Sequence, residues 1–166
     1  MVLQSEMLRL LNELSEEAQK WVGTKENDKV KVDLLRKVVD GVAVNEPWCM
    51  CFVQFCVRQI EIHCGYQSKI FKSEHCLTTW NKSPAMIRCS KPAVGLIAIW
   101  QHGNTASGHT GIVIDVVGEN DFTTVEANTT EAPVGIVRDG DGIYIKHRSM
   151  VQKSNMRLLG FLNPFM

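Results

Sequence analysis

The chain lacks an excess of charge of either sign. Eighteen lysine and arginine residues balance eighteen aspartate and glutamate residues among 166, and the sequence pI is about 6.9. Proteins that bind nucleic acid or an anionic membrane surface usually carry a basic patch, and no stretch here interleaves basic with aromatic residues. We therefore expect no nucleic-acid partner and no membrane partner.

Long hydrophobic runs are also missing. No apolar stretch approaches the roughly twenty residues that a membrane-spanning helix needs. The opening MVLQSEMLRLLNELSEEAQKW places acidic residues among leucines and shows no basic region followed by an apolar run, so it does not resemble a secretory signal. We expect a soluble protein made in the cytoplasm, which would act elsewhere only after lysis or dedicated export.

Several ligand-binding motifs are absent as well. The sequence has no P-loop, no G-x-G-x-x-G turn and no C-x₂-C zinc knuckle. Its six cysteines are residues 49, 51, 56, 64, 76 and 89, and their spacing suggests no regular disulfide pairing. Without an export signal we expect reduced thiols, no cofactor and no metal. Structural zinc held by some of these cysteines and nearby histidines is the alternative.

The order of apolar patterns predicts helices first and strands afterwards. Helices are predicted over residues 3–22, 32–39 and 48–62, with a short one at 76–80. Strands are predicted over residues 94–100, 109–117, 122–128, 142–147 and 157–162. This order indicates an α+β fold with an antiparallel sheet, and the length suits a single domain over residues 1–166.

Cys49 stands where the predicted helix over 48–62 begins. That helix is apolar on almost every face, which is typical of a buried element. Pro47 suits the first helical position, so Cys49 falls in the first turn. The unpaired N–H groups and positive dipole there favour a thiolate. The alternative is a small buried hydrophobic residue, and only a partner histidine can decide between the two.

His109 is the best-placed partner among five histidines, because it opens a predicted strand directly after a Ser-Gly pair. If Val117 pairs with Phe122, strand alternation puts His109 on the same face as Glu126 and Asn128, with Asn128 the nearer. Either side chain could orient the imidazole and complete a set of nucleophile, base and orienting group. The alternative is a solvent-facing polar stripe.

Four motifs in this order resemble the CHAP family, cysteine- and histidine-dependent amidohydrolases/peptidases related in fold to NlpC/P60 and papain-like enzymes. They are Glu46-Pro47-Trp48-Cys49 with Phe52-Val53, Lys91 to Trp100, Gly108-His109-Thr110-Gly111-Ile112-Val113, and Val125-Glu126-Ala127-Asn128-Thr129. They are similar to the family's nucleophile motif, its Pro-Gly-Asp strand, its Gly-His-x-Gly strand and its Glu-Gly-Asn-Thr strand. Arg157 to Phe161 is similar to the end of phage-type members.

The resemblance implies a papain-like α+β fold and an enzyme that cuts an amide bond of bacterial peptidoglycan. Cys49 would be the nucleophile and His109 the base, with Glu126 and Asn128 orienting it. The Cys49 backbone N–H would hold the oxyanion, and we take Asn45 as a candidate second donor. Some members bind calcium through aspartates around the cysteine. No such acidic cluster flanks Cys49, so we predict no calcium dependence.

Two enzyme activities fit this reading equally, a muramoyl-L-alanine amidase and a peptide endopeptidase, and specificity would depend on residues 66–88 and the loop 102–108. We expect a monomeric phage lysin (endolysin) that is bacteriolytic and acts on the cell wall after release. The alternatives are a secreted antibacterial effector with the same chemistry, and a catalytically silent binding module with structural zinc.

Overall fold

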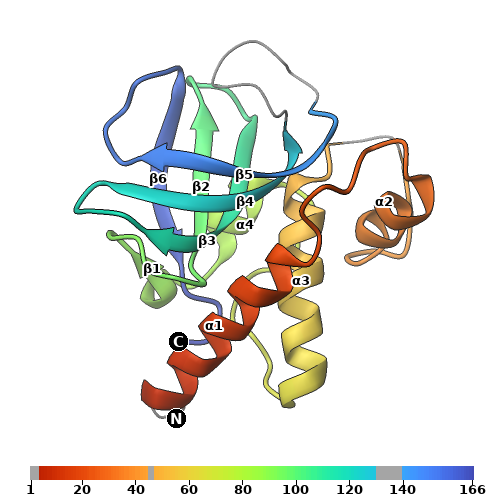
Figure 1. The fold of residues 1–166 in the computed structure, drawn as a ribbon, viewed down its shortest axis with the longest axis horizontal. Coiled ribbons are helices and arrows are strands. Elements are labelled where there is room, and N and C mark those ends of the chain that lie inside the picture. The colour runs from red at the N-terminus through yellow and green to blue at the C-terminus, as the bar shows by residue number, and fades with distance from the viewer. Residues whose placement is uncertain (1–3, 45–46, 130–139) are drawn as a thin grey trace.

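The computed structural model describes residues 4–44, 47–129 and 140–166 (Figure 1). Its helices are α1 (Gln4–Gln19), α2 (Lys29–Arg36), α3 (Cys49–Cys64) and α4 (Cys76–Lys82), with a 3₁₀ turn η1 (Ala85–Ile87). Its strands are β1 (Arg88–Cys89), β2 (Ile97–His102), β3 (Gly108–Val116), β4 (Asp121–Thr129), β5 (Gly142–Ser149) and β6 (Met156–Leu162). The prediction of an α+β fold is confirmed.

The six strands form one antiparallel sheet in the order β1-β6-β2-β3-β4-β5. The four strands from β2 to β5 follow the chain, as expected for strands joined by short connections. The last strand, β6, leaves this order and inserts between β1 and β2, where Ala98 pairs with Phe161. The C-terminal segment is therefore an internal part of the sheet (Figure 1).

Helix α3 is the buried helix of the fold. Most of its residues from Cys49 to Val57 have almost no exposed surface, and α1 lies beside it (Figure 1). The ring of Trp21, just after α1, meets Phe55 edge to face at 5.1 Å. Gly65 ends α3 in a left-handed conformation, with φ of 65°, as a glycine after a helix is expected to do. No helix in the described ranges is long and apolar enough to cross a membrane.

Two predicted helix starts are wrong, each for a local reason. Pro47 is not the first helical residue, because the buried Trp48 adopts φ −115° and ψ 15° and becomes the N-cap. Cys49 is therefore the first residue of α3. Helix α2 begins at Lys29 instead of Val32, because the Asp28 side chain accepts a hydrogen bond from a backbone N–H in the first turn.

The predicted pairing of β3 with β4 is also wrong. Phe122 pairs with Val116, one residue earlier than expected, and a bulge between Val113 and Asp115 shifts the register by one more, so that Val113 pairs with Thr124. The two shifts add to two residues. Because side chains alternate with a period of two, the predicted sharing of faces survives although the predicted partners do not.

Candidate active site

The Cys49 thiol lies at the N-terminus of α3, where the first backbone N–H groups of the helix have no partner within it. Its Sγ lies 3.6 Å from the Sγ of Cys76, the first residue of α4. Hydrogen bonds from Cys76, from His109 and from the Met50 backbone N–H outweigh burial and hold the pKa of Cys49 well below its ordinary value. Cys49 is therefore the thiolate of the pair.

Cys76 is the matching donor. The Cys49 thiolate accepts its S–H, and this contact together with burial raises the pKa of Cys76 well above its ordinary value. The two shifts have opposite directions, as expected when two close thiols cannot both ionise. Of the two thiols, Cys76 is therefore the one that keeps its proton.

The His109 imidazole stands between the thiolate and a carboxylate. Its Nε2 lies 2.7 Å from Oε2 of Glu126, so Nδ1 is the ring nitrogen that remains available to Cys49. Burial alone would lower the pKa of His109, but the Glu126 charge and the Cys49 contact raise it to about 9. The resting site is thus a thiolate–imidazolium pair, which is the activated form of a cysteine nucleophile.

The two glycines around His109 make room for these contacts. A Cβ on Gly108 would lie 2.7 Å from the backbone oxygen of Trp100 and 3.0 Å from Cβ of Cys76. A Cβ on Gly111 would lie 2.5 Å from Cγ of Glu126. The Gly-His-x-Gly pattern therefore has a packing reason. Each glycine lets a neighbour approach the imidazole's strand closely.

Glu126 is fully buried and its carboxylate is saturated with hydrogen bonds. Besides His109, it accepts from Thr124 Oγ1 at 2.6 Å and from two nitrogens of Arg148, Nε at 2.7 Å and Nη2 at 2.5 Å. Burial would raise the pKa of Glu126, but Arg148 and the His109 charge lower it well below its usual range. The carboxylate is therefore ionised and fixed in orientation.

Sequence reasoning missed Arg148. The predicted strand ended at His147, whereas β5 continues to Ser149 and places Arg148 opposite Phe122. The guanidinium also lies over the Trp100 ring, 5.3 Å from its centroid, while the same ring is 6.0 Å from the His109 ring. From the sequence one could expect only that a buried glutamate needs a positively charged partner. The sequence does not indicate which lysine or arginine that partner is.

A family model for the CHAP domain matches residues 41–128, more than half of the chain. The chain belongs to the CHAP family. The family comprises hydrolytic amidases and peptidases, so its chemistry agrees with the thiolate–imidazolium pair. The matched range contains Cys49, His109 and Glu126, whereas Arg148 lies beyond it. No curated protein and no solved structure matches the chain.

Asn128, the fourth residue implied by the CHAP resemblance, sits differently from the prediction. The imidazole hydrogen-bonds to Glu126, whereas the sequence had placed Asn128 nearer by register. Asn128 has a φ of 54°, the left-handed conformation, at a bulge where β4 and β5 lose register between Glu126 and Thr129. Asparagine tolerates this conformation better than most residues. The bulge shifts the pairing of β4 with β5 directly after Glu126.

We expect Asn128→Gly to keep the CHAP protein folded and active, because glycine adopts a positive φ without strain. Asn128→Ala should lower the free energy of unfolding by about 1–2 kcal/mol, because alanine lacks the short polar side chain that lets asparagine tolerate a left-handed conformation. Thermal unfolding and wall hydrolysis of both variants check this. If Asn128→Gly folds normally but loses hydrolysis, the amide itself orients the imidazole, as the resemblance implies.

The remaining predicted groups are less informative. Asn45, the candidate second oxyanion donor, lies outside the described residues. Within the described ranges, no group of three or more His, Cys, Asp or Glu side chains could hold a metal ion, and none of the cysteines forms a disulfide. The absence of calcium dependence stays a prediction.

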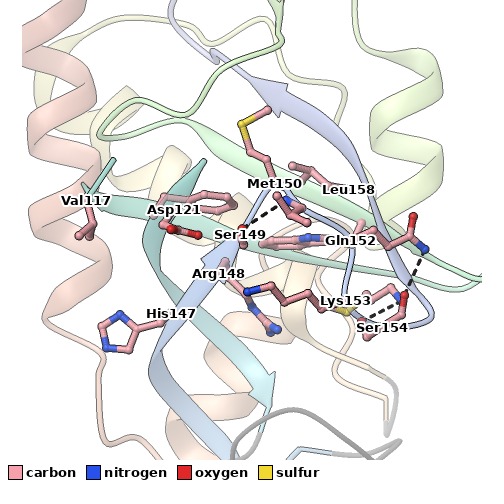
Figure 2. Close-up of a pocket in the computed structure, with 14 residues that line it drawn as sticks. Val117, Asp121, His147, Arg148, Ser149, Met150, Gln152, Lys153, Ser154 and Leu158 are labelled. Atoms are coloured by element: carbon pink, nitrogen blue, oxygen red, sulfur yellow. Dashed lines mark hydrogen bonds between the residues drawn. The ribbon is translucent and has the colours of Figure 1, made fainter. Parts of the chain in front are cut away.

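A cavity of about 300 Å³ lies beside the CHAP site, under the chain that joins β5 to β6. Trp100 and Arg148 line it, together with Met150 and Lys153 from that connection (Figure 2). The residues that line the cavity lie outside residues 66–88 and the loop 102–108, from which specificity was expected. Because Trp100 contacts His109 and Arg148 holds Glu126, a group bound in this cavity would touch the residues that support the catalytic pair.

Proposed function

We propose that this CHAP protein is a peptidoglycan hydrolase that cuts an amide bond of the bacterial cell wall through a thioester on Cys49. The observation that carries the proposal is the chain of contacts from the Cys49 thiolate through His109 to the buried Glu126. Nucleophile, proton carrier and orienting group occur together at the start of a buried helix. This arrangement is suited to acyl transfer.

In the first half of the reaction, the Cys49 sulfur attacks the amide carbonyl carbon. The negative charge that develops on the carbonyl oxygen is held by the backbone N–H of Cys49, which has no partner within α3. His109 then donates its proton to the leaving amine, the C–N bond breaks, and a thioester remains on Cys49.

In the second half, His109 is neutral and takes a proton from water. The resulting hydroxide attacks the thioester and releases the carboxylate product from Cys49. Throughout the cycle Glu126 accepts a hydrogen bond from the Nε2–H of His109 and keeps the ring turned toward the thiol. Arg148 and Thr124 hold that carboxylate in place, so they position the base without touching the substrate.

The amide is either the bond between muramic acid and L-alanine or a bond within the peptide stem or cross-bridge. We propose that the protein acts as a phage lysin, made in the cytoplasm and reaching the wall after release. Because the chain carries no net charge, long-range electrostatic attraction would not draw it to the wall, and local contacts would determine binding.

The rate of hydrolysis should have a characteristic pH dependence. The reactive form needs the Cys49 thiolate, which is lost as pH falls through its depressed pKa, and the His109 proton, which is lost as pH rises through about 9. We expect kcat/KM to stay level around neutrality and to fall above about pH 9. A rate that keeps rising beyond pH 9 would instead indicate an ordinary thiol that ionises without its imidazolium partner.

A turbidity assay on purified bacterial sacculi tests the proposed function. Wild-type protein should clear the suspension, and Cys49→Ala should leave it turbid because it lacks the sulfur that attacks the amide. A pelleting assay on the same samples separates enzyme from binding module. Wild-type protein that pellets with sacculi and never clears them would overturn the proposal in favour of binding.

A further inference from the structure

The pairing of Cys49 with a second thiol is not needed for amide hydrolysis. Cys49 is the first residue of α3 and Cys76 is the first residue of α4, so two helix N-termini meet at two sulfur atoms 3.6 Å apart. Both side chains are nearly buried, with 4% and 5% of their surfaces exposed. The mechanism above uses Cys49 alone as the reacting atom, so the presence of Cys76 requires another explanation.

The distance between the two sulfur atoms suits a bond that is not yet formed. A disulfide requires the sulfurs to be about 2.05 Å apart, so they would have to approach by about 1.6 Å from their 3.6 Å separation. Cys76 belongs to a helix of only seven residues, whereas Cys49 starts the buried α3. We expect rotation of the side chains and a small shift of α4 to supply the approach, while α3 stays in place.

We propose that Cys49 and Cys76 form a reversible oxidation site for hydroperoxides, with Cys49 as the reacting thiol and Cys76 as the resolving thiol. In the first step the Cys49 thiolate attacks a peroxide oxygen. The O–O bond breaks, an S–O bond forms, and hydroxide leaves, so Cys49 becomes a sulfenic acid and the peroxide is reduced.

In the second step Cys76 loses its proton to that hydroxide and its sulfur attacks the Cys49 sulfur. The S–S bond forms, the S–O bond breaks, and the departing oxygen takes the proton of the His109 imidazolium and leaves as water. Overall, two thiols and one hydrogen peroxide give one disulfide and two water molecules. A dithiol reverses the reaction by exchange and is itself oxidised to a disulfide.

The disulfide would block hydrolysis while preserving the nucleophile. A sulfenic acid without a nearby thiol goes on to sulfinic and sulfonic acids, which a dithiol does not reduce. With Cys76 in contact, capture competes with this loss. The inference shares with the proposed function only the reactivity of Cys49, and the disulfide can be detected by mass whether or not the protein cuts peptidoglycan.

The experiment treats the full chain with a few equivalents of hydrogen peroxide, alkylates the remaining thiols and maps the peptides by mass spectrometry. Wild type should yield one cross-linked pair, the Cys49 peptide joined to the Cys76 peptide, and its hydrolytic activity should return after dithiothreitol. Cys76→Ser should instead accumulate sulfinic and sulfonic Cys49, and dithiothreitol should restore less than about a tenth of its activity.

Cys89→Ser is the matched control, because Cys89 is half-buried on β1 and its thiol donates a hydrogen bond to the backbone oxygen of Ile87 at 3.9 Å. It should behave as wild type. Cys76→Ala serves as a second variant if Cys76→Ser does not fold. Wild-type protein whose Cys49 is oxidised to the same acids as in Cys76→Ser, with no Cys49–Cys76 peptide, would overturn the inference. If the disulfide forms in a protein that clears no sacculi, the inference stands and the proposed function fails.

Discussion

His109→Ala is expected to lower the rate of wall hydrolysis by about 10⁴-fold or more, because the same imidazole carries protons in both halves of the reaction. It should also change the resting thiol. The hydrogen bond and the charge of His109 help to hold the pKa of Cys49 down, so their removal should raise the pKa of that thiol. The rate of alkylation by iodoacetamide, followed against pH, measures this directly.

Wild-type protein should react with iodoacetamide well below the pH at which an ordinary cysteine does, and His109→Ala should shift the titration upward. His63→Ala is the matched control, because His63 lies exposed near the other end of the same helix. It should leave both the hydrolysis rate and the alkylation profile as in wild type. Unchanged alkylation in His109→Ala would contradict the thiolate–imidazolium pair.

Glu126→Gln is expected to reduce kcat by about 10²–10⁴-fold while changing KM little, because the carboxylate orients the base and does not bind substrate. The variant should also be less stable. It leaves the largely buried Arg148 without its anion, and breaking a buried ion pair on one side typically costs about 3–5 kcal/mol. Steady-state kinetics and thermal unfolding measure the two effects separately.

The pH dependence of stability gives the Glu126 prediction a second readout. Because the pKa of Glu126 is lowered on folding, the carboxylate contributes stability above its unfolded pKa of about 4.3, and that contribution is lost as pH falls. Glu126→Gln should therefore lose less stability than wild type on acidification. Arg148→Lys keeps a positive charge but not the two-pronged contact, so it should lower kcat less than Glu126→Gln. If Glu126→Gln loses as much stability on acidification as wild type does, the assignment of Glu126 as an ionised, stabilising carboxylate is contradicted.

The sequence was most informative where a few neighbouring residues determine the structure. A helix start, a glycine pair around His109 and the alternation of β4 are local features, so the contact between His109 and Glu126 could be anticipated even though the register was not. A bulge inserts one residue for reasons of twist and packing, and the alternation pattern of a strand does not reveal it. For the same reason, the strand pattern could not reveal that Asn128 lies at a bulge with a positive φ.

Long-range partners of the site could not be predicted. Arg148 reaches Glu126 from 22 positions along the chain because β5 pairs with β4, and Cys76 reaches Cys49 because α4 packs near the end of β3. Nothing in the residues around either one marks it as part of a site. Both became visible only when burial showed that a carboxylate and a thiolate needed donors.

Mass spectrometry of the soluble fragments released from purified peptidoglycan tests the central claim most directly. Wild-type protein and Cys49→Ala should be compared on the same wall. The expected result is a set of fragments with new amino and carboxyl termini, seen with wild type only, and no new reducing sugar ends. The position of the new termini would also identify the bond. Identical fragments from Cys49→Ala, or new reducing ends, would contradict amide hydrolysis by the Cys49 thiolate.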